Sequence, residues 1–269
     1  MSMRADVFLT EQGYAPSRQR ARELIERGLV TVDGKVVKKP SAQIDEGMHS
    51  VTVEDDLPFV SRGGLKLAAA LENFAVSPAG KDALDIGAST GGFTDCLLQG
   101  GAKSVCAVDA GCGQLAARLA EDARVRSLEH TNARELTLEV IGGVPVDLIV
   151  MDVSFISATY ILPRFTALLR DGGEAICLIK PQFEVGRAML GKGGIVKDPA
   201  AHRYAVERVV EAGIAAGLTP VGLMPSPIEG GDGNREFLIH FVLTDEERVP
   251  LSEGVIAAVT ACRRGLERR

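Results

Sequence analysis

The sequence of 269 residues has no tryptophan and only 3 tyrosines. With so few aromatic side chains, extensive stacking on single-stranded bases is a poor expectation for any nucleic-acid contact. No apolar run reaches the roughly 18 residues that a membrane-spanning helix needs. The longest candidate, 146–162, is interrupted by Asp147 and Asp152, and the opening stretch MSMRADVFLTEQ lacks the apolar segment of a secretory signal. We therefore expect no contact with a membrane.

Cysteine pairs of the CxxC type are also absent, since the 5 cysteines stand scattered through the chain. An odd, scattered set is typical of reduced thiols, so we expect a cytoplasmic protein without a metal site. The 46% hydrophobic and 25% charged content is that of a globular protein. The length allows one large α/β domain with a small module, or two ordinary domains.

The net charge of −6 does not by itself suggest a nucleic-acid partner, but the charge is unevenly distributed. Residues 1–40 contain eight Lys/Arg and five Asp/Glu, whereas the rest of the chain is acidic. A small surplus can arise by chance. Alternatively, the asymmetry indicates a basic module attached to an acidic body.

The first 56 residues predict a small α+β domain. Two short helices are expected at 4–13 and 18–27, the second capped by Ser17. The β-branched residues around Asp33-Gly34 predict a hairpin, and 43–53 supplies a further strand. We place a linker at 57–62 and a second domain at 63–269.

From residue 61 a helix to about 73 is followed by alternating strands and helices. Near-continuous apolar strands in such an alternation predict a doubly wound, mostly parallel seven-stranded sheet covered on both faces. The last strand follows a turn-rich stretch and is a candidate for antiparallel insertion. The predicted strands are 82–87, 104–109, 124–129, 146–152, 174–180, 218–224 and 236–243. The predicted helices between them are 92–100, 113–121, 156–170 and 199–216.

A glycine-rich loop, Asp85-Ile-Gly-Ala-Ser-Thr-Gly-Gly-Phe93, follows the first strand of this sheet. Its spacing fits neither the GxGxxG dinucleotide fingerprint nor a phosphate loop. A loop without a phosphate cradle but with an acidic residue suits a cationic nucleoside, and S-adenosylmethionine is such a ligand. Asp109, at the end of the second strand, can accept both ribose hydroxyls, and Asn132 can face the adenine edge. A structural glycine turn is the alternative. The predicted cofactor-binding residues are Asp85, Gly87, Ser89, Thr90, Gly91, Gly92, Phe93, Asp109, Asn132 and Asp152.

Chemistry is expected where the fourth and fifth strands end, at Asp152-Val-Ser-Phe and Lys180-Pro-Gln-Phe. The two prolines that usually hold a planar amine in amino-group methyltransferases are missing after Asp152. No cysteine stands there to act as a nucleophile for carbon methylation. Lys180 closes an apolar strand, which favours a functional lysine over a surface one that extends into solvent.

With these motifs, residues 60–245 resemble the FtsJ-like ribose 2'-O-methyltransferases of RNA. That group uses a Lys–Asp–Lys–Glu tetrad, and the resemblance implies that Lys66, Asp152, Lys180 and Glu236 are catalytic. The whole chain resembles the TlyA/hemolysin A family through SRGGLKL, DIGASTGGFTD, MDVSFIS, IKPQFE and GNREF. The resemblance implies a class I, Rossmann-like methyltransferase domain with an N-terminal RNA-binding domain of the S4 type. It also implies S-adenosylmethionine as cofactor and ribosomal RNA, in ribosomal subunits, as the partner.

Basic side chains on the N-terminal domain and on the glycine-rich segment 186–197 are candidates for phosphate contacts. Pairing of the arginines with Glu11, Glu23 and Glu26 is the alternative for the first group, and a solvated loop for the second. The arginines at 263–269 are further candidates. The predicted RNA-binding residues are Arg4, Arg18, Arg20, Arg22, Lys35, Lys38, Lys39, Arg187 and Lys192.

Three other functions remain open from the sequence. A membrane-active haemolysin lacks a spanning segment or a strongly amphipathic basic helix. A non-catalytic ribosome-assembly factor would not need the four tetrad residues. A small-molecule methyltransferase would leave the basic N-terminal domain without a role.

Overall fold

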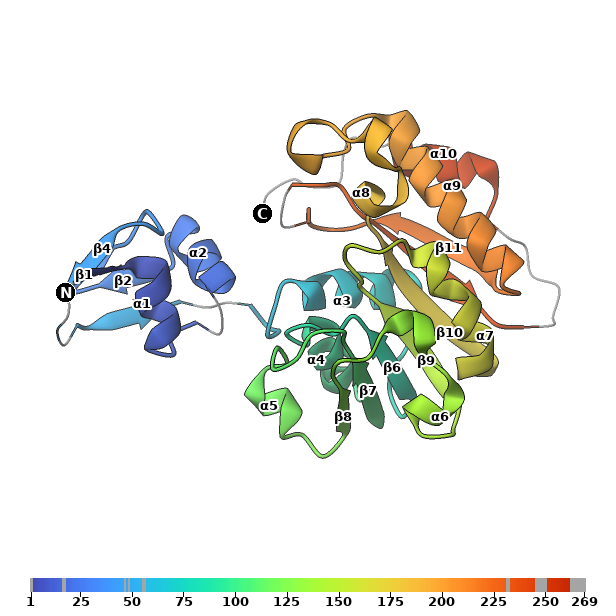
Figure 1. The fold of residues 1–269 in the computed structure, drawn as a ribbon, viewed down its shortest axis with the longest axis horizontal. Coiled ribbons are helices and arrows are strands. Elements are labelled where there is room, and N and C mark those ends of the chain that lie inside the picture. The colour runs from blue at the N-terminus through green and yellow to red at the C-terminus, as the bar shows by residue number, and fades with distance from the viewer. Residues whose placement is uncertain are drawn as a thin grey trace. The chain divides into compact units, whose positions relative to one another are not determined.

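The computed structural model describes residues 2–15, 18–45, 47, 49–54, 57–230, 233–244 and 251–261. The chain divides into two compact units, Met1–Ser61 and Arg62–Arg269, which are treated separately (Figure 1). Ser17, the expected helix cap, lies outside the described residues.

The small unit holds two helices against two short antiparallel sheets. Its elements are β1 (Ser2–Arg4), α1 (Ala5–Glu11), α2 (Arg18–Glu26), β2 (Val30–Val32), β3 (Lys35–Val36), β4 (Gln43–Asp45) and β5 (Val51–Val53). The sheet orders are β1-β4 and β3-β2-β5. The Asp33-Gly34 turn joins β2 to β3 as predicted, with a positive φ at both residues. The single strand expected at 43–53 is wrong, because β4 and β5 are separate strands that pair with different partners.

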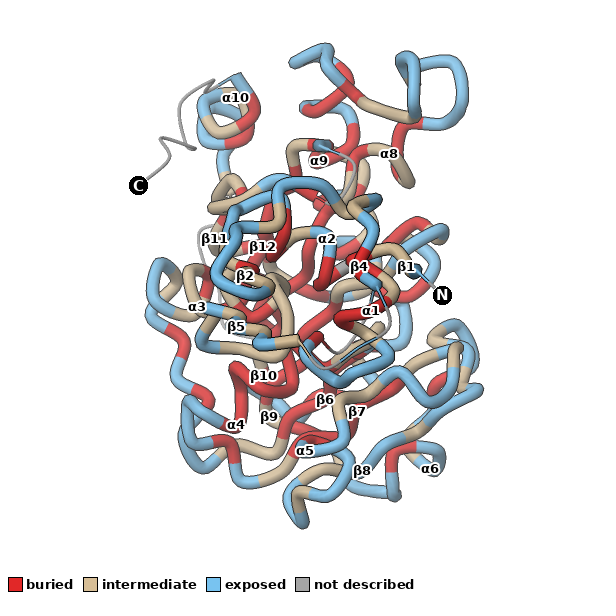
Figure 2. The backbone as a smooth tube through the Cα atoms, turned by 90° about the vertical axis from the view of Figure 1, so that its left-hand side faces the viewer, coloured by how far each residue is buried: buried red, intermediate tan, exposed pale blue. Residues whose placement is uncertain are grey.

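The large unit is built on a seven-stranded sheet of order β11-β12-β10-β9-β6-β7-β8. The strands are β6 (Asp82–Ile86), β7 (Ser104–Val108), β8 (Val125–Leu128), β9 (Val146–Met151), β10 (Leu169–Ile179), β11 (Thr219–Pro225) and β12 (Phe237–Val242). Strand β12 runs antiparallel to both of its neighbours, which confirms the expected insertion. All other pairs are parallel. The central strands β6, β9 and β10 are buried along most of their length (Figure 2).

The helices cover both faces of this sheet. They are α3 (Gly63–Asn73), α4 (Gly92–Gln99), α5 (Ala117–Ala120), α6 (Leu138–Ile141), α7 (Phe165–Leu168), α8 (Pro181–Glu184), α9 (Pro199–Ala215) and α10 (Glu253–Ala261). The described part of this unit also contains the 3-10 turns η1 (Ala133–Glu135), η2 (Ala158–Tyr160), η3 (Leu162–Arg164), η4 (Arg187–Met189) and η5 (Lys192–Gly194). Ile86, Met151, Cys177 and Ile239 form one row of register partners on the face that α9 covers. Asp85 alternates with Ile86 and therefore faces α4 on the other side.

Two predicted helices differ from the structure. The helix expected at 156–170 is broken into η2, η3 and α7, because Pro163 stands in the first turn of η3 and lacks an amide donor. The helix expected at 113–121 is shortened to α5, since Gly113 has a positive φ of 63°. Helix α10 had no counterpart among the expected elements.

Candidate active site

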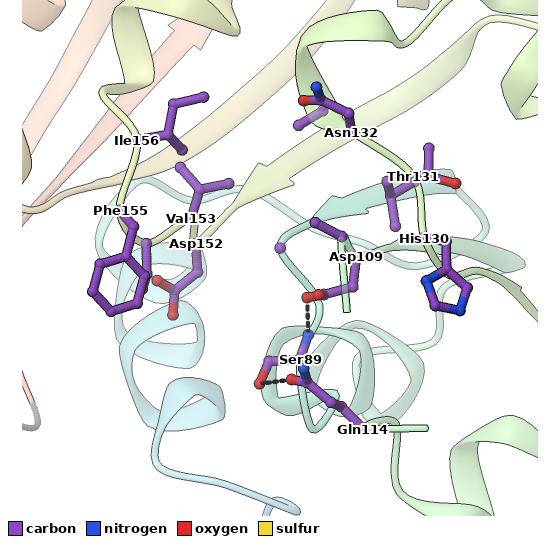
Figure 3. A pocket seen from close by; sticks show the side chains of 15 residues that line it. Ser89, Asp109, Gln114, His130, Thr131, Asn132, Asp152, Val153, Phe155 and Ile156 are labelled. Atoms are coloured by element: carbon purple, nitrogen blue, oxygen red, sulfur yellow. Dashed lines mark hydrogen bonds between the residues drawn. The ribbon is translucent and has the colours of Figure 1, made fainter. Parts of the chain in front are cut away.

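A pocket of about 730 Å³ opens at the carboxyl ends of β6, β7 and β9 (Figure 3). Gly87 begins the loop after β6 with a φ of +85°, and a Cβ there would lie 2.5 Å from the Asp152 carbonyl oxygen. Only glycine therefore allows the loop to pass so close to the end of β9.

Asp109 lies in the pocket wall with its carboxylate held by two backbone amides. Ser89 N donates to Oδ2 at 2.8 Å, and Gly111 N donates to Oδ1 at 2.7 Å. Each carboxylate oxygen has more than one acceptor site, so both can still accept a hydroxyl proton. The geometry suits the vicinal hydroxyls of a ribose.

The other predicted cofactor residues fall into two groups. Gly87, Ser89, Asn132 and Asp152 line the pocket with Asp109. The amide of Asn132 also caps η1, accepting from Arg134 N and donating to Glu135 Oε1, both at 3.1 Å. The remaining predicted residues, Asp85, Thr90, Gly91, Gly92 and Phe93, do not belong to the lining and lie in β6, in the loop itself and in the first turn of α4.

Asp85 is fully buried, and its Oδ2 accepts a hydrogen bond from Thr94 Oγ1 at 2.6 Å. Burial raises the pKa of Asp85 to about 7, against the hydrogen bond from Thr94 and with a further contribution from the Asp152 carboxylate. A buried group behind the pocket lining, close enough to respond to the Asp152 charge, therefore changes its own charge near neutral pH.

Sequence reasoning missed several residues of the lining. They follow the ends of β7, β8 and β9 and could have been found by extending each strand end by a few residues. They are Ala110, Gln114, His130, Thr131, Ala133, Val153, Ser154, Phe155 and Ile156, with Val108 from β7 itself. None of the described residues that line this pocket is a lysine or an arginine. A pocket with two carboxylates and no cationic side chain fits a cationic nucleoside such as S-adenosylmethionine and disfavours a phosphate.

A second pocket, of about 260 Å³, adjoins the first and shares Ser154 and Phe155 with it. Lys180 and Glu236 line it, and Leu190, Gly193 and Gly194 of the glycine-rich segment close one side. Asn234 secures that segment, since its Oδ1 accepts from Val196 N at 2.9 Å and its Nδ2 donates to Gly194 O at 3.2 Å.

Three of the tetrad residues line the pockets, Asp152 the larger one and Lys180 and Glu236 the smaller one, and Lys66 contacts Glu236. Lys180 Nζ lies 2.7 Å from Asp152 Oδ1 and donates its hydrogen bond to Ser154 Oγ at 2.8 Å. Beneath them, Lys66 Nζ donates to Glu236 Oε2 at 2.6 Å, and both side chains are buried. Burial raises the pKa of Glu236, and the Lys66 ammonium opposes that rise. A Cβ at Gly230 would lie 2.5 Å from Glu236 Oε1, so the glycine leaves room for this carboxylate.

Phe155 is the most unusual side chain of the site. It is 92% exposed, has a φ of +64°, and its ring lies 5.3 Å from that of Phe183. A large aromatic residue in the left-handed region is strained, and such strain is concentrated at functional positions. The loop that carries it is anchored by buried Glu184, which accepts hydrogen bonds from Ser157 Oγ and Ala158 N.

The predicted RNA-binding residues fall into buried and exposed groups. The side chain of Arg20 is only 6% exposed and pairs with Glu23, so it belongs to the interior of the small unit and not to a basic face. Arg18, Arg22, Lys35, Lys38, Lys39, Arg187 and Lys192 are exposed, and Arg4 is half-buried. The arginines at 263–269 lie outside the described residues.

Two further searches cover only the residues described by the structure. Among them, no helix combines the length and apolar character needed to cross a membrane. The same residues contain no cluster of three or more His, Cys, Asp or Glu side chains arranged to hold a metal ion.

The strand order, the glycine loop after β6 and the acidic residue after β7 define a class I methyltransferase. Residues 59–243 match the model of the FtsJ-like methyltransferases, and residues 3–50 match that of the S4 domain. The chain therefore belongs to the FtsJ-like methyltransferases and, within them, to the TlyA/hemolysin A family.

Individual relatives cover almost the whole chain. YqxC of Bacillus subtilis, which carries the provisional name of an rRNA methyltransferase, is 46% identical to this chain. The match covers 88% of this chain and 84% of YqxC. The 16S/23S rRNA (cytidine-2'-O)-methyltransferase TlyA of Mycobacterium tuberculosis is 44% identical over 95% of each chain. A solved structure from Streptococcus thermophilus, classed provisionally as a hemolysin, is 41% identical with a TM-score of 0.79 and covers 97% of this chain and 94% of its own.

The titration of Asp85 predicts that the affinity for S-adenosylmethionine depends on pH. Below pH 7 the Asp85 carboxyl is mostly protonated, and a cation in the pocket favours its ionised form, so binding releases a proton. We expect the affinity to rise by up to about tenfold per pH unit below pH 7 and to level off above it. Calorimetry in buffers of different ionisation enthalpy measures the released proton directly.

Asp85→Asn removes this titration and should bind with a nearly constant affinity from pH 6 to pH 8. His130→Gln is the matched control, because it changes a residue of the pocket lining but keeps Asp85. S-adenosylhomocysteine, which lacks the sulfonium charge, should show the weaker pH dependence. An Asp85→Asn variant with the full pH dependence of the wild type would contradict the assignment.

Proposed function

We propose that this chain transfers the methyl group of S-adenosylmethionine to the ribose 2'-hydroxyl of a cytidine in ribosomal RNA. The observation that carries the proposal is the position of Lys180 and Asp152, whose ion pair bridges the two pockets. A methyl donor in the larger pocket and a ribose in the smaller one would meet at this pair. The names of the relatives supply the ribosomal RNA, the cytidine and the 2'-oxygen.

S-adenosylmethionine supplies a methyl group on a positively charged sulfur. The ribose hydroxyl is a weak acid, so the enzyme must align its oxygen with that methyl group and accept its proton. Lys180 is the candidate for the accepting group, because it lines the smaller pocket and its Nζ contacts Asp152 of the larger one. As a base Lys180 must first release to solvent the proton of its ion pair with Asp152, and Asp152 then holds the ammonium that forms again when the ribose proton arrives.

Lys66 and Glu236 support this step from below. Their buried ion pair fixes the Glu236 carboxylate in the wall of the smaller pocket, within the electrostatic reach of Lys180. A carboxylate there can orient Lys180 and accept a hydrogen bond from the ribose. Substrate contact by the exposed ring of Phe155 would hold the nucleotide, since every base offers a face to an aromatic side chain.

The experiment that tests the function transfers labelled methyl from S-adenosylmethionine to isolated small and large ribosomal subunits. Nuclease digestion and mass spectrometry then locate the label, which we expect on the 2'-oxygen of a cytidine. Methylation of a base would contradict the proposal. A liposome-leakage assay on the same protein separates it from membrane activity.

Lys180→Ala should lower the rate of methyl transfer by at least about 100-fold, because it removes the proton acceptor. The affinity for S-adenosylmethionine should persist or increase, since Asp152 loses its counter-ion. Lys103→Ala is the control, because it removes a lysine from a more exposed ion pair outside both pockets, Lys103 Nζ to Asp82 Oδ2 at 2.9 Å, just before β7 and at the start of β6. Transfer by Lys180→Ala at the control's rate would remove Lys180 from the mechanism.

Phe155→Ala should lower kcat/KM for ribosomal subunits by about 5- to 150-fold, the value of one stacked base. Phe155→Trp should keep most of the wild-type kcat/KM, because it retains an aromatic ring, and Phe155→Leu should lose nearly as much as Phe155→Ala. Tyr160→Ala serves as the control, because Tyr160 is also an exposed aromatic residue, at 58%, and belongs to neither pocket lining. Unchanged kcat/KM in Phe155→Ala would rule out a stacking role.

A further inference from the structure

The small unit contains a buried carboxylate beneath two of its surface arginines. Asp6, in the first turn of α1, has an exposure of 0%. Its Oδ1 accepts from Arg4 Nε at 2.9 Å, and its Oδ2 accepts from Arg4 Nη2 at 3.1 Å and from Arg18 Nη2 at 3.3 Å. One carboxylate thus holds two guanidinium groups that come from separate elements, β1 and α2.

Both arginines remain accessible on their outer sides. The exposed fractions of their side chains are 43% for Arg4 and 60% for Arg18, against 0% for Asp6. The inner N–H groups are bound to the carboxylate, while donors of each guanidinium that Asp6 does not use are left for a ligand. The hydrogen bond from Arg4 keeps the pKa of Asp6 below its usual value, so the carboxylate stays ionised at neutral pH.

Lys38 and Lys39 immediately precede a segment that is hydrogen-bonded to the start of α1, where Asp6 lies. Asp6 N donates to Pro40 O at 3.1 Å and Ala5 N donates to Ala42 O at 2.8 Å, which ties the segment after Lys38 and Lys39 to the start of α1. Helices α1 and α2 and strand β1 pack together around this point (Figure 1). The segments that these bonds connect therefore include Lys38 and Lys39 as well as Arg4.

We propose that Asp6 is a positioning residue that orients Arg4 and Arg18 as one paired-guanidinium site for the phosphate backbone of RNA. A guanidinium presents its donors in a planar fork that matches two phosphate oxygens, but the long side chain loses entropy when it is fixed. Asp6 fixes both forks before RNA arrives, which lowers that cost. The proposal rests on the proposed function only for its choice of RNA as partner.

The direction in which Asp6→Asn changes the affinity for RNA shows whether Asp6 orients the two arginines or only neutralises their charge. Asp6→Asn makes the small unit more positive, so binding to ribosomal subunits would tighten if Asp6 only cancelled charge. If Asp6 orients the arginines, affinity should instead fall by about 3- to 10-fold, and the slope of log K against log salt should shrink by about one phosphate or more. Asp45→Asn is the matched control, because it removes the same charge from an exposed position on β4 and should bind equally or more tightly.

A double-mutant cycle keeps the test independent of folding. In the background Arg4→Gln/Arg18→Gln, the orienting role is gone, so adding Asp6→Asn should cost no further affinity, whereas a merely structural loss would persist. The arginine double variant alone should lower the salt slope by about two phosphates. An unchanged slope, or tighter binding of Asp6→Asn, overturns the proposal.

Methyl transfer measured with the same variants reports on the proposed function separately. At saturating ribosomal subunits Asp6→Asn should transfer methyl at the wild-type rate, because the reacting groups belong to the large unit. If the wild type transferred no methyl to ribosomal RNA, the proposed function would fall. The loss of RNA affinity in Asp6→Asn would still establish the phosphate site.

Discussion

The buried ion pair between Lys66 and Glu236 is the contact on which the reaction site depends. It joins α3, before the sheet, to the residue that precedes β12, across 170 positions of the chain. Two buried charges are costly to desolvate, and removing either one leaves the other unpaired at a cost of about 3–5 kcal/mol. Hydrophobic residues would pack this place at least as well, so the pair is better explained by the carboxylate it holds in the smaller pocket than by stability.

The sheet topology explains why the second ion pair lies beside the first. Parallel neighbours β9 and β10 end at the same edge, so the residues that follow them, Asp152 and Lys180, come within contact. The antiparallel strand β12 pairs with β10 and begins at that edge, which adds Glu236. The tetrad is therefore a consequence of strand order, with α3 supplying the one member that does not border a strand.

Much of the site was predictable from the sequence, because the end of an apolar run marks the end of a buried strand. Asp109, Asp152 and Lys180 each follow such a run, and the structure places all of them around the pockets. The exposure of Phe155 was not predictable, since it depends on a positive φ that no local pattern requires of a phenylalanine. The burial of Arg20 was predictable, because Arg20 stands one helical turn before buried Leu24, on the apolar face of α2.

One device recurs in both units, a carboxylate placed under or beside a cation. Glu236 holds Lys66, Asp152 holds Lys180, and Asp6 holds two arginines. Asp6, Asp85, Glu184 and Glu236 are at most 2% exposed, so they count toward the net charge of −6 but present little negative surface to a ligand. An acidic chain can therefore offer RNA a basic surface, because part of its acidity lies inside, and in the small unit buried Asp6 holds two arginines whose outer sides stay exposed.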